Sequence, residues 1–273
     1  MIHNSFQYSI FDPTGNITAL VEGDVCIEDQ PAAAAEIMKT HPEVEQVGFI
    51  RIPDGSEDGY DVDLRMTGGE FCGNASMCAA VFYVMRNSER NENHIKTVKL
   101  RVSGTSEPVI VDIGPACHNS FNASITMPDA VDISTNLFAF EKLSENLPVV
   151  KYEGIVHIII TPASPFYYFL NNRKDAEFAV KKWCEELKSD GLGLMFLDQK
   201  ADAYQLTPLV YIPGSGTLFW ENSCASGSAA VGLYLAKNNG CHLKGILHEP
   251  GGNLTVESDP VSQKTILSSL IKI

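Results

Sequence analysis

The feature that most constrains the fold of this chain is an internal repeat. The segment 71–85, FCGNASMCAAVFYVM, aligns with the segment 223–237, SCASGSAAVGLYLAK, and the alignment places Cys72 and Cys224 at the same position. Each segment follows a strand-like run and a short polar turn, and each begins a helix that is apolar nearly all round, as a buried helix is. The repeat therefore predicts two related halves, each built around a central buried helix.

Short runs with β-propensity recur between a smaller number of helical windows. Strands are predicted at 16–21, 47–52, 60–66, 97–102, 109–113, 124–127, 155–160, 166–170, 206–212, 218–221 and 252–256, and helices at 32–40, 74–86, 175–188 and 226–238. This pattern is typical of an α/β or α+β protein. Turn-forming and acidic residues gather in 129–146, so we expect the boundary between the halves there, with residues 1–128 before it and 129–261 after it.

The composition limits the partners. Twenty Lys and Arg against 34 Asp and Glu give a formal net charge of -14, which would repel nucleic acids and anionic membranes. The first residues contain no basic segment followed by an apolar one, and the longest apolar stretch falls short of the ~20 residues that cross a bilayer. The seven cysteines are odd in number and scattered, as reduced thiols are. We therefore expect a cytoplasmic protein that acts on a small molecule.

A cysteine at the start of a helix has special chemistry. The first N–H groups of a helix have no intrahelical partners and carry the positive end of the helix dipole, so they favour a thiolate and also bind anions such as carboxylates. We therefore expect lowered pKa values for the thiols of Cys72 and Cys224. Small residues follow both cysteines and allow a ligand to approach the backbone closely. These residues are Gly73, Asn74, Ala225 and Ser226.

Two such helix starts facing one cleft would place a sulfur on each side of the α-carbon of a bound carboxylate. One thiolate would remove the α-proton and the opposite thiol would return a proton to the other face, while the N–H groups stabilise the negative charge of the intermediate. This arrangement predicts a racemase or epimerase that needs no cofactor. An isolated cysteine in an apolar helix is more often a core residue. We assign that role to the remaining five, which are Cys26, Cys78, Cys117, Cys184 and Cys241.

The residues around both cysteines resemble a known family. Phe71-Cys-Gly-Asn74 and Ser223-Cys-Ala-Ser-Gly227 are similar to the two cysteine motifs of the diaminopimelate epimerase and proline racemase superfamily of cofactor-independent racemases. The resemblance extends over nearly the whole chain. It implies a diaminopimelate-epimerase-like fold with two pseudo-symmetric domains, each a barrel-like sheet around a central helix, with the C-terminal strand 262–273 joined to the first half. The active site would lie between the domains, in a homodimer.

The resemblance also implies roles for single residues. Thr14-Gly-Asn16 and Gln46 correspond to substrate-binding segments, and His157 and Glu221 correspond to residues that assist the thiols. From the sequence alone, His157 could equally be a hydrogen-bonded core residue, Glu221 a solvated turn acid and Asn16 a turn residue. The expected catalytic set is therefore Cys72, Cys224, His157 and Glu221, with no metal.

Departures from the superfamily pattern bear on the substrate. Diaminopimelate epimerases hold the far end of their substrate with a Glu-Arg pair before the second cysteine, whereas this chain has Glu221-Asn222-Ser223 there. A second charged terminus would therefore be left unpaired, at a cost of several kcal/mol. Gly69-Glu-Phe-Cys-Gly-Asn-Ala-Ser76 and Phe219-Trp-Glu-Asn-Ser-Cys224 instead resemble the histidine racemases of staphylopine-type metallophore biosynthesis. That resemblance implies histidine as the substrate.

Other functions remain open at this stage. The enzymatic alternatives are a diaminopimelate epimerase, a racemase of another amino acid, and an isomerase of the phenazine-biosynthesis type, which has the same fold but lacks the two thiols. A metal-binding or redox protein is the alternative from a different class. Cys72 and Cys78 are six residues apart in a predicted helix and point to different faces, so they do not have the spacing of a zinc site.

Overall fold

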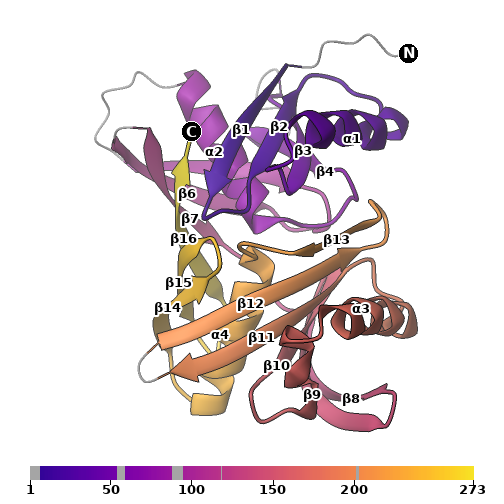
Figure 1. Ribbon diagram of the computed structural model, residues 1–273. Helices are drawn as coiled ribbons and strands as arrows, with labels where there is room; N and C mark the ends of the chain where they lie inside the picture. The colour runs from indigo at the N-terminus through magenta and orange to yellow at the C-terminus, as the bar shows by residue number, and fades with distance from the viewer. Residues whose placement is uncertain (1–6, 54–58, 88–94, 118, 201–202) are drawn as a thin grey trace.

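The computed structural model describes residues 7–53, 59–87, 95–117, 119–200 and 203–273 (Figure 1). All four predicted helices are confirmed. They are α1 (Gln30–Thr40), α2 (Gly73–Asn87), α3 (Arg173–Leu187) and α4 (Ala225–Asn239). Within the described ranges, none of the helices has both the length and the apolar character needed to cross a membrane.

The strands form one continuous, highly curved sheet. Along the chain they are β1 (Gln7–Pro13), β2 (Thr18–Glu22), β3 (Gln46–Arg51), β4 (Val62–Met66), β5 (Lys96–Val102), β6 (Val109–Cys117), β7 (Ser120–Thr126), β8 (Asp132–Phe140), β9 (Leu143–Tyr152), β10 (Ile155–Ile160), β11 (Leu192–Lys200), β12 (Ala203–Ile212), β13 (Thr217–Trp220), β14 (Leu243–Glu249), β15 (Gly252–Ser258) and β16 (Thr265–Lys272). The spatial order is β1 to β7, then β16, β15, β14, β12, β11, β10, β9 and β8, and β13 pairs with β12.

The repeat seen in the sequence is also a repeat of topology. In the first half, β2 pairs parallel with β3 across α1, and β4 pairs parallel with β5 across α2. In the second half, β10 pairs parallel with β11 across α3, and β12 pairs parallel with β14 across α4. A parallel pair requires a crossover connection, which these helices provide. The two central helices α2 and α4 therefore occupy equivalent places.

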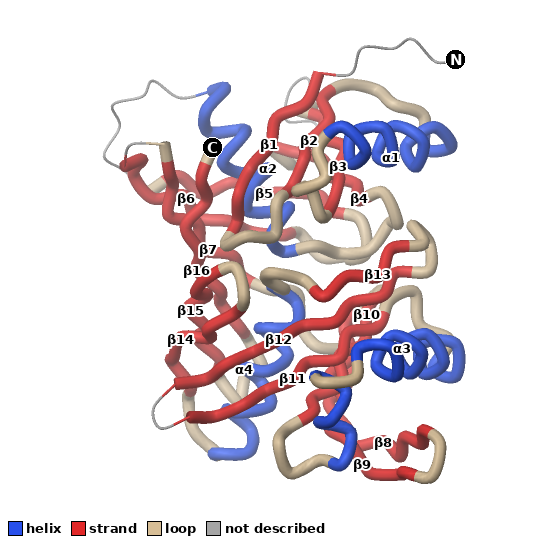
Figure 2. The backbone as a smooth tube through the Cα atoms, viewed as in Figure 1, coloured by secondary structure: helices blue, strands red, loops and turns tan. Residues whose placement is uncertain are grey.

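Strand β16 connects the two halves. It pairs antiparallel with β7 on one side and with β15 on the other, and its end also pairs with β1. The contact with β1 closes an eight-stranded barrel around α2 (Figure 2). Helix α4 lies against β15 and β11 of the second half and against the connecting strand β16. Both central helices are apolar on every side because both are enclosed by sheet, and their buried residues belong to one shared hydrophobic core.

The other two helices cover the outside of the sheet. Helix α1 packs on β3, and the residues between them form a small separate core that includes Ile37 and Phe49. Helix α3 packs on β11 and β12 over a second core, in which Trp183 is fully buried. These outer helices alternate apolar and polar faces, as the sequence pattern predicts for helices that meet solvent on one side.

One predicted strand is wrong. Residues 166–170 were expected to form a strand, but they lie in a 3₁₀ helix, Pro165–Leu170. Proline is favoured at the first helical position, and the Ser164 side chain caps the helix by accepting the Phe166 N–H at 3.1 Å. Residues 132–146, in the region where the boundary between the halves was expected, belong to the hairpin of β8 and β9, in which β8 is an edge strand.

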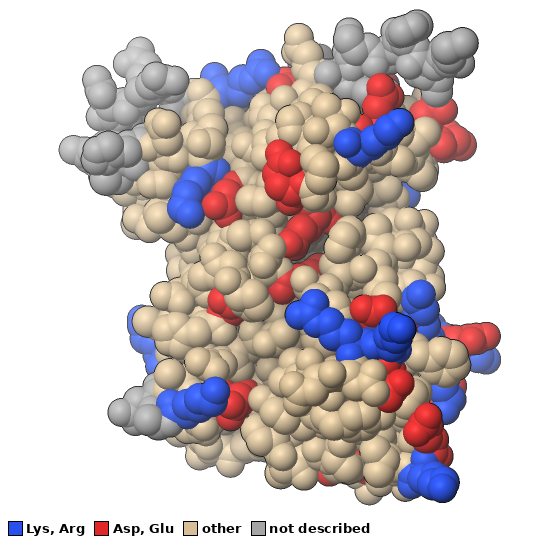
Figure 3. All heavy atoms as spheres, viewed as in Figure 1, with Lys and Arg blue, Asp and Glu red and all other residues tan. Residues whose placement is uncertain are grey.

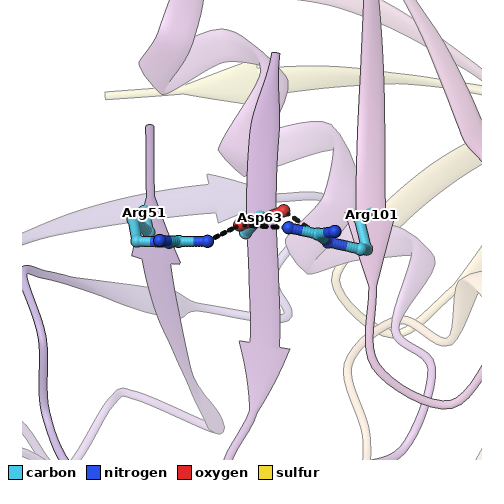
Figure 4. A network of polar contacts seen from close by, with 3 residues as sticks. All are labelled: Arg51, Asp63 and Arg101. Atoms are coloured by element: carbon cyan, nitrogen blue, oxygen red, sulfur yellow. Dashed lines mark hydrogen bonds and ion pairs between the residues drawn. The ribbon is translucent and has the colours of Figure 1, made fainter. Parts of the chain in front are cut away.

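On the outside of the first half, one carboxylate joins three neighbouring strands (Figure 4). Asp63 of β4 accepts hydrogen bonds from Arg51 of β3 at 2.6 Å and from Arg101 of β5 at 2.8 and 2.9 Å. Partial burial raises the pKa of Asp63, but the hydrogen bonds and charges of Arg101 and Arg51 outweigh it and hold the pKa below its ordinary value.

The substitution Asp63→Asn is therefore expected to lower the free energy of unfolding at neutral pH by about 1 kcal/mol. A carboxylate whose pKa is depressed in the folded state stabilises the fold at pH values above its unfolded pKa. The difference in unfolding free energy between wild type and Asp63→Asn should therefore shrink as the pH falls below about 4. Urea unfolding at several pH values measures this. Asp112→Asn, which removes a carboxylate bonded only to Thr97, is the control. Equal stability of wild type and Asp63→Asn at pH 7 would contradict the prediction.

Candidate active site

The starts of α2 and α4 meet at the junction of the two halves (Figure 1). A small, partly open cavity of about 40 Å³ lies there. It is lined by Asn16, Gln46, Glu70, Phe71, Cys72, Gly73, Asn74, Ile155, Val210, Ile212, Glu221, Ser223, Cys224, Ala225 and Ser226. Of the ten candidate residues from the sequence, nine line this cavity and the tenth, His157, lies behind it. Acidic side chains also lie along the junction on the face seen in Figure 3.

Cys72 lies immediately before the first residue of α2. Its Sγ accepts the N–H of Ala75 at 3.4 Å, as expected for a sulfur at a helix start, and donates to Gln46 Oε1 at 3.0 Å. Gln46 is held by its own donor to Thr18 Oγ1 at 2.7 Å. The thiol is therefore fixed between the end of a helix and an oriented amide from β3.

Cys224 occupies the equivalent position before α4, with an extended backbone. Its N–H points to the carboxyl of Glu249, with 3.2 Å to the nearer oxygen, and Glu249 also accepts from Ser228 Oγ at 2.8 Å. The Cys224 thiol lies 3.7 Å from Ser226 Oγ and close enough to Glu221 for that carboxyl to raise its pKa. Each thiol thus has a polar partner from the segment before its helix or from a neighbouring strand.

The two helix starts touch each other at Gly73 and Ala225. A Cβ placed on Gly73 would lie 2.8 Å from the Cβ of Ala225, closer than side-chain carbons approach. The residue after the cysteine is glycine in the first motif and alanine in the second. At this contact a single methyl group fits, and this chain places it on the second helix.

Gly73→Ala is therefore expected to lower the free energy of unfolding by about 1–3 kcal/mol, because two methyl groups would overlap at the centre of the molecule. The double variant Gly73→Ala with Ala225→Gly moves the methyl group from one helix to the other and should recover most of that loss. Thermal or urea unfolding of the three proteins measures this. Unchanged stability of the single Gly73→Ala variant would show that the helix starts can separate freely.

Asparagines and one glutamate tie the two halves together beside the cavity. Asn16 Nδ2 donates to Glu45 at 2.6 Å, and Glu45 also accepts from the side chain of Asn222 at 2.5 Å. Asn74 Nδ2 donates to Asn16 Oδ1 at 3.0 Å and to the carbonyl of Ser223 at 3.2 Å. Asn74 Oδ1 is buried and has no hydrogen-bond partner, so it remains available to a donor inside the cavity.

Burial dominates the acid–base state of the site. It raises the pKa of Glu221 to about 8 and that of Glu249 to about 7, and the nearby carboxyls Glu45, Glu249 and Glu70 raise Glu221 further. The thiols do not follow the expectation of lowered pKa values: burial, with a contribution from Glu221, raises the pKa of Cys72 to about 12 and that of Cys224 well above its ordinary value. The helix N–H groups lower these values as expected, but less than burial raises them.

His157 lies behind Ser226. It is fully buried in β10, and its Nε2 is 2.9 Å from Ser226 Oγ. Burial lowers the pKa of its ring to about 3, so the imidazole is neutral. Its Nδ1 is buried without a hydrogen-bond partner. The structure therefore connects His157 to Cys224 through one hydroxyl group, and the histidine does not line the cavity.

Sequence reasoning did not single out three carboxyls of this region, Glu45, Glu70 and Glu249. Glu45 precedes Gln46, Glu70 lies two residues before Cys72, and Glu249 precedes a Pro-Gly-Gly turn. Only the folded chain brings all three to the same junction. In the part of the chain that the structure describes, no group of three or more His, Cys, Asp and Glu side chains is placed to hold a metal ion.

The fold is one that solved racemases and epimerases share. A hydroxyproline epimerase from Agrobacterium vitis, solved with trans-4-hydroxy-L-proline, has the same fold, with a TM-score of 0.65, 12% identity, and coverage of 98% of this chain and 89% of the other. The family described as "histidine racemase CntK N-terminal domain" matches residues 5–272. The chain belongs to this histidine racemase family.

Curated relatives agree with the family match. A histidine racemase of Staphylococcus aureus strain Mu50 is 31% identical over 255 residues, which cover 92% of this chain and 88% of the relative. A histidine racemase of Fusobacterium nucleatum is 33% identical over 235 residues, covering 83% and 79%. The similarity therefore extends through both halves and both cysteine motifs. The protein is an isomerase of the racemase type.

Proposed function

We propose that this protein interconverts L- and D-histidine, with Cys72 and Cys224 as base and acid on opposite faces of the α-carbon. The observation that carries the proposal is that two thiols, related by the internal repeat and each placed at a helix start, line the same cavity. The choice of histidine is supported by the relatives of that name and by the wall of the cavity, whose described residues include no Lys or Arg to pair with a second carboxylate.

In this proposal the substrate carboxylate binds the unpaired N–H groups at both helix starts, those of Gly73 and Asn74 and those of Ala225 and Ser226. These groups stabilise the negative charge that spreads into the carboxylate when the α-proton leaves. The substrate ammonium brings a positive charge next to the thiols and the cavity carboxyls. An adjacent positive charge favours thiolate, so substrate binding lowers the thiol pKa values that burial has raised.

In each turnover the α-carbon loses one proton and gains one proton. One thiolate takes the α-proton and becomes a thiol, the electron pair of the C–H bond passes into the carboxylate, and the opposite thiol protonates the other face and becomes a thiolate. The two sulfurs have then exchanged roles. Glu221, in contact with Cys224, is the group that takes up and returns the Cys224 proton when the enzyme resets. His157 acts as a positioning residue that orients Ser226 beside Cys224.

We further propose that the enzyme is a cytoplasmic homodimer that works without a cofactor and supplies D-histidine for a staphylopine-type metallophore. Exposed apolar side chains support the dimer: Ile246 of β14 and Ile266 and Leu270 of β16 lie on one outer face of the sheet and are 42–48% exposed. Sedimentation of wild type and of Leu270→Glu tests this, with a dimer expected for the first and a monomer for the second.

The test of the activity is incubation with L-histidine in deuterated buffer. Loss of the α-proton signal and appearance of D-histidine on a chiral column are expected, and a parallel panel should include diaminopimelate and other L-amino acids. The double variant Cys72→Ser with Cys224→Ser is the control for uncatalysed exchange. Turnover of diaminopimelate without turnover of histidine would overturn the proposed substrate.

A further inference from the structure

One carboxyl in the cavity has no role in the proton transfers described above. Glu70 lies two residues before Cys72 in the turn between β4 and α2 and lines the same cavity as both thiols. Its Oε2 is buried and has no hydrogen-bond partner. A buried, unpaired carboxyl oxygen costs free energy unless a ligand or a water molecule completes it.

The position of Glu70 is fixed by its surroundings. Its carbonyl accepts from Ser103 Oγ at 2.9 Å, and the same hydroxyl accepts the N–H of Met66 at 2.9 Å, so the turn is tied to the end of β4. A Cβ on Gly68 would lie 2.5 Å from Oε2, so the carboxyl rests directly on the backbone of this turn. Because its position is fixed, the Glu70 carboxyl can distinguish ligands that reach it with a hydrogen-bond donor from ligands that do not.

The wall that accompanies Glu70 is apolar. Ile155, Val210 and Ile212 of the second half line the cavity together with it. These apolar side chains can pack against the faces of a planar ring, whereas the carboxyl of Glu70 can form a hydrogen bond with a polar atom at the edge of that ring. By contrast, the polar groups Asn16, Asn74 and Glu221 lie around the cysteines, where the ammonium and carboxylate of the substrate belong.

On its other side Glu70 borders a larger surface pocket of about 500 Å³. Five glycines and the acidic side chains of Glu153 and Asp190 line this pocket, and its described lining contains no Lys or Arg. Arg65 lies near Glu70 and opposes this charge, but the lining of the pocket itself favours a hydrogen-bond donor or a cation over a carboxylate.

Building on the proposed function, we infer that Glu70 binds the substrate side chain by a hydrogen bond to a ring nitrogen of the imidazole. In the proposed binding mode, the carboxylate, ammonium and α-hydrogen of the substrate face the helix starts and the sulfurs. The substrate side chain then points toward Glu70, the remaining polar group of the cavity. Burial raises the pKa of Glu70, while backbone hydrogen bonds at Glu70 and Gly68 and the charge of Arg65 lower it. An aliphatic side chain would leave this carboxyl unpaired and would be rejected.

The test combines changes in the enzyme with changes in the ligand. Glu70→Gln and Glu70→Ala are expected to raise KM for L-histidine at least tenfold, the loss typical of a hydrogen bond to a charged group. Glu153→Gln, which changes a carboxyl of the neighbouring pocket outside the cavity, should leave KM within twofold. Inhibition by the two ring-N-methylated L-histidines gives the more specific measurement. Wild type should prefer one isomer by at least tenfold, and Glu70→Ala should reduce that preference to less than threefold.

The outcomes separate this inference from the proposed function. Wild type that does not racemise histidine overturns the function. Wild type that racemises histidine, with unchanged KM in Glu70→Gln or an unchanged preference between methylhistidines in Glu70→Ala, overturns the role of Glu70 and leaves the function standing. If circular dichroism shows that Glu70→Ala does not fold, the same ligand comparison is made with Glu70→Gln.

Discussion

Replacement of either Cys72 or Cys224 with serine is expected to lower histidine racemisation by at least 10³-fold without unfolding the protein. A serine hydroxyl keeps the shape and the hydrogen bonds of the thiol, but it ionises far less readily and is a poor base and acid near neutral pH. Removal of a general acid or base costs about 10²–10⁴-fold in rate. Each single variant still holds one intact thiol, so each should exchange the α-proton of one enantiomer faster than that of the other.

The measurement is α-deuterium incorporation into L- and D-histidine separately, beside net racemisation. Cys78→Ala is the matched control, since this cysteine lies in the same helix as Cys72 but is packed in the core and does not line the cavity. It should racemise at close to the wild-type rate. A Cys72→Ser or Cys224→Ser variant that retains wild-type racemisation would exclude the two-thiol mechanism.

Glu221→Gln is expected to lower kcat/KM by about 10²-fold, because the amide cannot accept the proton of Cys224. The change should also appear in the pH profile. Burial raises the pKa of Glu221 to about 8, so at neutral pH most of this carboxyl is protonated and cannot act as a base. In wild type, kcat/KM should therefore rise with pH through about 8 as Glu221 ionises.

In Glu221→Gln this rise near pH 8 should be missing, and activity should increase only at higher pH, where the thiols themselves ionise. Rates from pH 6 to 10 measure both profiles, and Glu153→Gln, a carboxyl outside the cavity, should behave as wild type. A variant that keeps the rise near pH 8 would assign it to another group, and Glu249, with a pKa of about 7, would then be the next residue to replace.

Much of the fold followed from local pattern. The four helices were predicted because their apolar residues recur with helical spacing, and α2 and α4 were recognised as buried because they are apolar on all sides. Strands β1, β8, β9, β11 and β14 were not predicted, and β16 was expected only from the family resemblance. Several of them have polar or charged outer faces and acquire their strand conformation from pairing with distant segments, as β16 does with β7 and β1.

The sequence by itself determined the repeat and, through it, the two cysteines at equivalent helix starts, because a duplicated helix with the same flanking residues is visible without coordinates. Only the tertiary structure decided the chemistry around them. The raised pKa values of the thiols follow from enclosure between two halves, and the fit of one methyl group between Gly73 and Ala225 depends on where two helices meet. The placement of Glu70 with Ile155 and Ile212 likewise joins residues far apart in the chain. Burial and contact are properties of such long-range packing, and a local sequence pattern does not contain them.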